Sequence, residues 1–212
     1  MQLRFLLLLL AVAASAAAQP PKVSLGLSAG YAGDDTPRRI KDSSGFTIGP
    51  RVDLSFTGHI ELTVNLLYRR TGQSSDNFFF PADVNQLPPQ ASVFVGSISR
   101  GRSLELPVIG SYHFGSASRS WRPFLGAGFA LRTQWGDTTS TLLRRGPDDQ
   151  PRYDTFRGSI PNNVGAGVVT AAGVTLRQGR FVFVPEVRYT YWGERGPGSP
   201  RSQAHAMLSI RF

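Results

Sequence analysis

Apolar residues alternate with polar or small residues in eight separate stretches of this chain. The last stretch, Ala204–Phe212, shows the pattern most clearly, because apolar side chains occupy every even position up to the terminal phenylalanine. A period of two predicts a β-strand with one apolar and one polar face. The predicted strands are Val23–Tyr31, Phe46–Phe56, Ile60–Arg70, Ser103–Phe114, Pro123–Thr133, Val164–Leu176, Arg180–Trp192 and Ala204–Phe212.

The connections between these strands alternate in length. Long connections at 32–45, 71–102, 134–162 and 193–201 are separated by short ones at 57–59, 115–121 and 177–179. Outer-membrane barrels combine tilted strands of roughly 9–11 residues with long outer loops and short periplasmic turns. We therefore predict an all-β fold, an eight-stranded antiparallel up-and-down transmembrane β-barrel, with long outer loops and short periplasmic turns.

A soluble eight-stranded barrel of the lipocalin kind would show the same alternation. Two features favour the membrane. The polar faces hold mainly Gly, Ser and Thr with a few charges, which suits a narrow lumen better than a water-facing surface. Aromatic residues on the apolar faces gather near strand ends, like interfacial girdles. These aromatics are Tyr31, Phe46, Phe56, Tyr68, Phe114, Phe181, Tyr191 and Phe212. Trp121, Trp135 and Trp192 flank strands and are predicted to be interface anchors.

The amino-terminal segment has the pattern of a secretory leader. Arg4 supplies a positive charge, Phe5–Ala14 is an apolar run too short to span a bilayer, and three alanines form a cleavage site. We predict a cleaved signal peptide at 1–18 and a barrel domain at 19–212, exported through the periplasm to the cell outer membrane. The chain contains no cysteine, so neither disulfides nor lipoprotein anchoring are expected.

The formal net charge of +9 is concentrated at one end of the predicted barrel. The long connections are nearly neutral, whereas the short connections and the amino end carry basic residues without acidic ones: Lys22, Arg119, Arg122, Arg177 and Arg180. A nucleic-acid footprint would instead cluster on one face with stacking aromatics, so no nucleic-acid partner is predicted. The basic ring could meet phospholipid headgroups or peptidoglycan by charge.

Two features depart from simple strand patterns. Pro50, Pro107 and Pro185 lie inside predicted strands, where proline removes a ladder donor, so a local bulge or an unpaired carbonyl is expected at each. The strand-like stretch Ala91–Ser99 is predicted to prolong the strand Ser103–Phe114 outside the membrane; a further hairpin, giving a ten-stranded barrel, is the alternative.

Two strand motifs resemble a known family. The run SLELPVIGSYHF at Ser103–Phe114 followed by RPFLGAGFAL at Arg122–Leu131 resembles the PorT-like outer-membrane protein β-barrel family, which shows an L-E-[IL]-P strand and then a P-[FY]-L-x-[AG]-G strand. GFTIGPRVDLSF at Gly45–Phe56 is similar to the second strand of that family. The resemblance implies a small OmpA/OmpX-type barrel and supplies no catalytic residues.

An eight-stranded barrel has an interior just wide enough for side chains to fill. A small-solute channel is therefore the less favoured alternative. Buried charges need partners, so we predict a lumen charge network. In its outer layer Glu105 is predicted to lie between Arg69 and Arg132. The mid-barrel layer is Arg51 with Asp53 and Glu186 with Arg188, and Glu61 and Arg211 lie near the periplasmic end.

A lipid A-modifying outer-membrane enzyme is the functional alternative. Such a hydrolase needs a nucleophile, a base and an orienting group within reach of one another. His113 and His205 face inward, and Ser111 lies two residues from His113, but no acidic residue is near them in sequence. We predict structural lumen histidines, no catalytic residues, no metal and no cofactor.

The long outer loops are the remaining place for a specific function. Phe78, Phe79 and Phe80 are consecutive in one loop and could contact a partner, since exposed apolar clusters mark interaction sites. We predict a non-enzymatic, monomeric barrel with a structural or surface-interaction role. Expected partners are outer-membrane lipids, the barrel-assembly machinery reading Phe212 as an insertion signal, and a surface ligand or protein that the sequence does not name.

Overall fold

The computed structural model describes residues 21–34, 45–76, 92–116, 118–145, 148, 150–193 and 201–212. The predicted leader at 1–18 and the Phe78–Phe80 cluster lie outside these residues. No helix among the described residues is long and apolar enough to cross a membrane. The strands are β1 Lys22–Asp34, β2 Phe46–Ser55, β3 Ile60–Asn65, β4 Leu67–Asp76, β5 Ser92–His113, β6 Trp121–Arg145, β7 Pro151–Gln178, β8 Phe181–Trp192 and β9 Ser202–Arg211.

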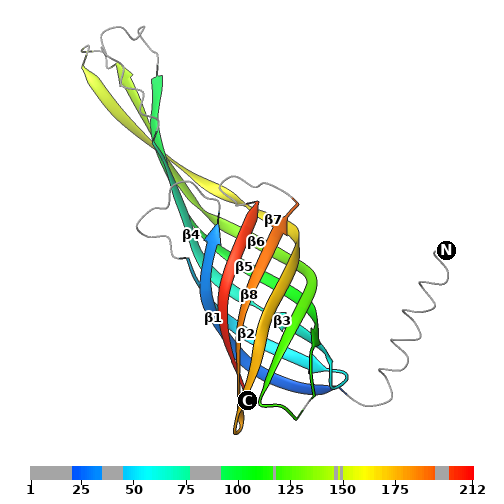
Figure 1. Ribbon diagram of the computed structural model, residues 1–212. Coiled ribbons are helices and arrows are strands. Elements are labelled where there is room, and N and C mark those ends of the chain that lie inside the picture. Colours follow the sequence, from blue (N-terminus) through cyan, green and yellow to red (C-terminus); the bar gives the residue numbers. More distant parts are fainter. Residues whose placement is uncertain are drawn as a thin grey trace, which may run out of the picture.

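All strands pair in antiparallel fashion, and β1 pairs with both β2 and β9, so the sheet closes into a barrel (Figure 1). The third predicted strand is divided into β3 and β4 at Leu66, but both halves keep one register with β5. They therefore act as a single strand of the ring, which has eight members. The predicted eight-stranded fold is confirmed, and the short turns and the carboxyl end lie at the end opposite the long hairpins (Figure 1).

Side-chain burial is inverted relative to a water-soluble protein. In β9 the odd-numbered residues are buried, Ser209 and Arg211 among them, whereas Leu208 is 49% exposed. The same alternation gives β1 and β8 exposed apolar faces, with Leu27 56% exposed. A continuous apolar outer surface with charges inside is the burial expected of a protein surrounded by lipid.

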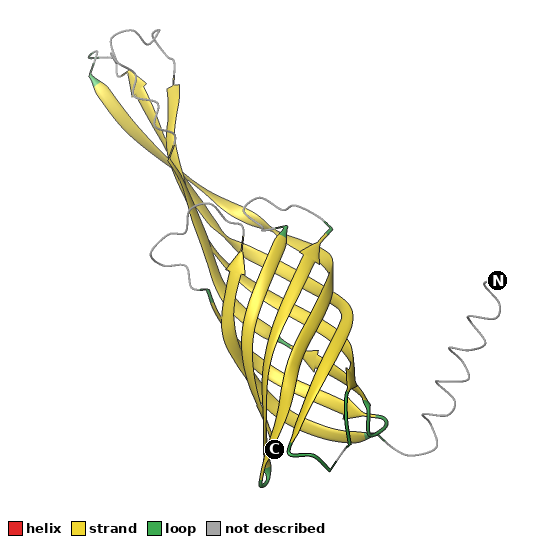
Figure 2. Cartoon of the chain, viewed as in Figure 1, coloured by secondary structure: helices red, strands yellow, loops and turns green. Residues whose placement is uncertain are grey.

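The strands β5, β6 and β7 are longer than predicted, with 22, 25 and 28 residues. Ser92–Ser99 is part of β5, so this stretch extends a strand and adds no hairpin of its own. Figure 2 shows the three strands leaving the barrel rim as a narrow twisted sheet. Residues 71–76, 92–102, 134–145 and 151–162, which were predicted to be connections, are therefore strand. Outside the membrane neither face of a strand meets lipid, so the apolar alternation that signals a strand is weak there.

The three strand prolines leave gaps in the ladder without shifting its register, so the bulge, one of the two expected outcomes, does not occur at any of them. Each proline stays paired on one side, with Leu27, Ala130 and Leu208 respectively. On the other side the pairing skips the proline and resumes in the same register. A strand residue directs its N–H toward one neighbour only, so proline removes bonds on that side alone. Register shifts occur instead at Phe94/Gly96 and Gln134/Gly136.

One part of the lumen is apolar rather than charged. Its buried residues are Ile109, Phe124, Ala130, Val169, Ala171, Val184 and Trp192. The prediction that Trp192 is an interface anchor is wrong, because its side chain is fully buried. Tyr191 faces outward, so strand alternation turns Trp192 into the barrel, where its Nε1 donates a hydrogen bond to Gln203. Trp121, by contrast, is 53% exposed.

Candidate functional site: the charged lumen and the outer extension

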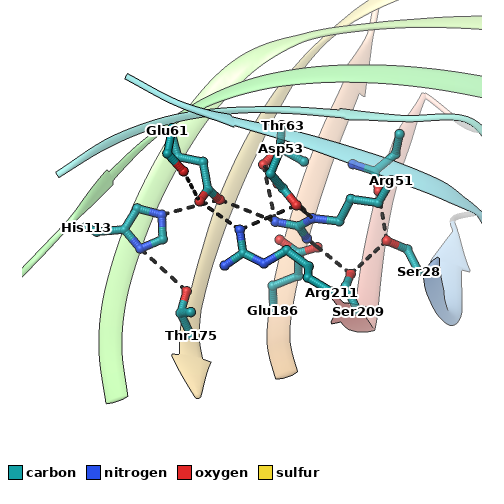
Figure 3. Close-up of polar contacts among 12 residues, drawn as sticks. Ser28, Arg51, Asp53, Glu61, Thr63, His113, Thr175, Glu186, Ser209 and Arg211 are labelled. Atoms are coloured by element: carbon teal, nitrogen blue, oxygen red, sulfur yellow. Dashed lines mark hydrogen bonds and ion pairs between the residues drawn. The ribbon is translucent and has the colours of Figure 1, made fainter. Parts of the chain in front are cut away.

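Arg51 on β2 is the centre of the mid-lumen polar network (Figure 3). Its Nε donates to both carboxylate oxygens of Asp53 at 2.9 and 2.8 Å. Its Nη1 donates to Glu186 on β8 at 3.1 Å, and its Nη2 donates to the Thr63 hydroxyl at 3.2 Å. The Thr63 hydroxyl in turn donates to Asp53 at 2.6 Å. One guanidinium thus ties β2 to strands on both sides of the lumen.

A second arginine joins this cluster to the periplasmic end of the barrel. Arg211 Nη1 donates to Glu61 at 2.7 Å and lies 3.4 Å from Asp53. Arg188 donates to Glu186, which also accepts from Arg51. The residues predicted as separate mid-barrel and periplasmic groups therefore form one continuous cluster. Buried charges are tolerated in this way when each has opposite charges and hydrogen bonds around it.

Glu105 lies in a separate, outer cluster. Its carboxylate is 3.8 Å from Arg69 Nη2, and it accepts a hydrogen bond of 3.2 Å from Gln203 Nε2. Arg132 is the cross-strand neighbour of Glu105 in the β5–β6 ladder, and its guanidinium lies 4.1 Å from the centre of the Trp192 ring. Gln203 and Trp192 were not among the predicted network residues. Applying the inward parity of the predicted strand Arg180–Trp192 to its last residue would have found Trp192, and extending the last strand by one residue would have found Gln203.

The two lumen histidines make polar contacts within these clusters. His113 Nε2 is 3.5 Å from Glu61, and its Nδ1 is 3.5 Å from the Thr175 hydroxyl (Figure 3). His205 Nε2 is 3.9 Å from Glu105. Among the described residues Ser111 makes no hydrogen bond with His113, and no three His, Asp or Glu side chains gather to hold a metal ion.

A cleft of about 540 Å³ lies at the base of the outer extension, by which we mean residues 92–99, 137–145 and 151–160 of β5, β6 and β7. Arg70, Arg102 and Trp135 are neighbours across three strands, and Arg100 pairs with Asp137 one step further out. The described lining of the cleft contains three arginines and one carboxylate, so these residues together carry a net positive charge. We call this cleft the basal cleft.

The far end of the extension carries surface ion pairs and exposed aromatics. Arg152 donates to Asp148 at 3.3 Å. The pKa of the Asp148 carboxyl lies below its ordinary value because its own backbone N–H bonds to it, with a further contribution from Arg152. Tyr153 is 67% exposed and Phe156 is 50% exposed. Aromatic side chains at such positions provide contact area for another molecule.

Comparisons with known proteins agree with this architecture. The family model described as outer membrane protein beta-barrel domain matches residues 5–181. No curated protein matches the sequence. The fold is similar to the crystal structure of Neisserial surface protein A, with a TM-score of 0.53 and 12% identity over 91% of this chain and 98% of that chain.

Two further solved barrels align with the chain. The amino-terminal barrel domain of Pseudomonas aeruginosa OprF has a TM-score of 0.42 and 14% identity, covering 91% of this chain and 99% of that one. Ail of Yersinia pestis has a TM-score of 0.42 and 9% identity, covering 91% and 97%. The family match spans most of the chain, and the inverted burial fits a bilayer. The chain belongs to the outer membrane protein β-barrel domain family and is a transmembrane protein of the Gram-negative outer membrane.

Proposed function

We propose that this protein is a non-enzymatic surface barrel that binds an anionic ligand at the cell exterior through the basal cleft and outer extension. The observation that carries the proposal is the continuation of three strands past the barrel. At the outer end, pairing of β7 with β8 stops at Gly167, and pairing of β4 with β5 stops at Asp76–Gly96. Beyond these points β6 and β7 stay paired with each other as far as Arg145–Pro151, so they continue past the barrel. A paired sheet holds its side chains in fixed positions, as a binding site requires.

The chemistry of the basal cleft supports an anionic ligand. Arg70, Arg100 and Arg102 are exposed, and guanidinium groups bind carboxylate, sulfate or phosphate oxygens through paired N–H donors. Trp135 adds a flat surface suited to stacking against a sugar ring or an acyl chain. The alternative interpretation is that these arginines face solvent and bind no ligand. Three of them on adjacent strands around one cleft, however, make a concentrated positive field that favours an anion.

The R100A/R102A double variant is expected to lose at least about tenfold in affinity for anionic ligands, since two charged donors are removed. Binding is measured on a microarray of anionic and neutral oligosaccharides with the protein in lipid nanodiscs. R119A, in a short turn at the opposite end of the barrel, is the control and is expected to bind like the natural protein. Equal binding by the natural protein and the double variant, or preference for neutral sugars, contradicts the proposal.

A second variant tests the extension itself. Asp137 and Ser159 are cross-strand partners, so residues 138–158 can be replaced by Asn-Gly, the pair that favours a two-residue hairpin turn. The lumen network is untouched by this change, and folding is checked by heat-modifiable migration on gels. Retention of full ligand binding would leave the cleft as the binding element and remove the distal extension from the proposal.

The lumen is proposed to be closed rather than a channel. Arg51, Arg188, Asp53 and Glu186 are all at most 5% exposed and bridge opposite strands. We expect no resolved single-channel steps from the purified protein in planar bilayers, because passage would require breaking buried ion pairs. A large open porin measured in the same bilayer provides the positive control. Reproducible open steps from the natural protein would favour the small-solute channel.

A lipid A-modifying enzyme is less well supported by the geometry. Thr175, His113 and Glu61 form a chain resembling a nucleophile, a base and an acid, but both links are 3.5 Å long. Glu61 is also engaged by Arg211. The group lies at the periplasmic mouth, whereas lipid A occupies the outer leaflet across the membrane. We therefore assign these residues a structural role.

Several partner assignments accompany this proposal. The exposed girdle residues support contact with outer-membrane lipids, and Phe212, which is 66% exposed beside β1, supports recognition by the barrel-assembly machinery. We propose removal of residues 1–18 on export, a barrel domain at 19–212 and a monomeric state. The motifs at Ser103–Phe114 and Arg122–Leu131 support membership of the PorT-like branch.

A further inference from the structure

The periplasmic mouth of the barrel contains a second cavity, distinct from the basal cleft and at the other end of the molecule. Its volume is about 310 Å³, within the range of small-ligand sites. Five basic side chains and one carboxylate line it: Lys22, Arg122, Arg177, Arg180, Arg211 and Glu61. These residues come from the ends of β1, β3, β6, β7 and β9 and from the turn before β8, so only the closed barrel brings them together.

The carboxylate cannot neutralise this group of cations. Glu61 is bound by Arg211 at 2.7 Å and lies 3.5 Å from His113 and 3.8 Å from Arg51. Among the described residues no ion pair engages Lys22, Arg122, Arg177 or Arg180. Arg180 lies instead over the Phe181 ring at 5.0 Å. The cavity therefore carries a positive field that its own side chains do not balance.

Two buried donors in this cavity have no acceptor among the residues that the structure describes. Arg211 is 6% exposed, and its Nε makes no hydrogen bond. The Nε of Arg122 is likewise buried without a partner, although its Nη2 donates to the Gly58 carbonyl. Buried donors that lack an acceptor are costly, and the cost is removed when a bound anion accepts from them.

From the cavity, the unbalanced charge and the orphaned donors, we propose that the periplasmic mouth is a binding site for a phosphate group. Guanidinium N–H pairs match phosphate oxygens, and several arginines around one cavity provide a polydentate site. Phe212 lines the same cavity and is exposed at the membrane rim. A phospholipid headgroup of the inner leaflet and a free periplasmic phosphate both present the required chemistry.

The test uses the full-length protein folded in uncharged maltoside micelles, with isothermal titration calorimetry of two probes. These probes are inorganic phosphate and dihexanoyl-phosphatidylglycerol below its critical micelle concentration. We expect at least one to bind, and we expect R177A/R180A to weaken binding at least about tenfold because two charged donors are lost. R119A/R201A removes two exposed arginines that line neither cavity and is expected to bind like the natural protein.

The outcomes distinguish a free phosphate from a lipid headgroup, and they test this site separately from the basal cleft. Binding of inorganic phosphate identifies a free phosphate as sufficient, whereas binding of phosphatidylglycerol alone identifies a lipid headgroup. No binding of either probe, or equal binding by R177A/R180A, overturns the site. Binding of a peptidoglycan fragment in place of both phosphate probes also overturns it. The ligand proposed for the basal cleft is tested with other residues and other probes, so either proposal can fail alone.

Discussion

Replacing Arg51 with alanine is expected to lower the free energy of unfolding by about 3–5 kcal/mol. The substitution leaves the Asp53 and Glu186 carboxylates inside the lumen without the guanidinium that donates to both of them. Breaking a buried pair is costly because the remaining charge keeps its desolvation penalty. The effect is measured by urea titration of the barrel in phospholipid vesicles. Tryptophan fluorescence is a suitable signal, since Trp192 is buried only in the folded state.

Arg152→Ala is the matched control for this measurement. Arg152 also pairs with a carboxylate, Asp148 at 3.3 Å, but both side chains are more than half exposed. Exposed pairs contribute about 1 kcal/mol or less. Each variant removes an arginine that pairs with a carboxylate, but only the Arg51 pair is buried. The difference between the two losses of stability therefore measures the effect of burial. Similar losses for Arg51→Ala and Arg152→Ala would mean that the lumen network does not hold the barrel together.

Replacing Gly128 with alanine is expected to cost about 3 kcal/mol, the upper end of the range for overpacked cores. Gly128 on β6 lies opposite Ile109 on β5. An added Cβ would meet the Val108 carbonyl oxygen and would lie 2.9 Å from the Ile109 Cα. Both are backbone atoms of a paired strand, so relief requires movement of β5 itself. The measurement is the same urea titration, with heat-modifiable migration as a test of barrel formation.

Gly165→Ala provides the contrast within the same wall of the barrel. Gly165 on β7 is paired with Arg132 and is buried, yet nothing lies within 4 Å of an added Cβ. We expect a change within about 1 kcal/mol, in the stabilising direction, since alanine restricts the unfolded chain more than glycine. A loss at Gly165 as large as that at Gly128 would show that backbone flexibility, rather than space, limits these positions.

The membrane-spanning part of the fold could be predicted because each of its strands has lipid on one side and the lumen on the other. That contrast imposes strict alternation, as in Ala204–Phe212, and the structure follows it through β9. Outside the bilayer the contrast disappears, so residues 92–99, 137–145 and 151–160 continue as strand with little apolar signal. Residue type and position alone predict Trp192 at the interface, whereas its alternation with exposed Tyr191 turns it inward.

The alternation of lipid-facing and lumen-facing residues also allowed the charged lumen residues to be predicted from sequence. The partners of these residues could be predicted only for some of them. Alternation places Arg51 and Arg211 inside, yet the contacts across the lumen depend on strand tilt and shear, which no single strand encodes. The Arg51–Glu186 bond joins residues 135 positions apart. The contact of Asp53 with Arg211 is of the same kind, whereas its pairing with Arg51 lies within one strand and could be predicted.

By itself, the sequence determined the strand number, the direction each side chain faces in the membrane and the excess of positive charge at the short turns. Those properties are local, because each depends on a residue's own strand and its neighbours. Only the tertiary structure decided which charges meet, how far β5–β7 extend, and that Lys22, Arg122, Arg177 and Arg211 surround one cavity. Those properties depend on closure of the sheet, which brings β1 beside β9 and sets the register around the whole ring.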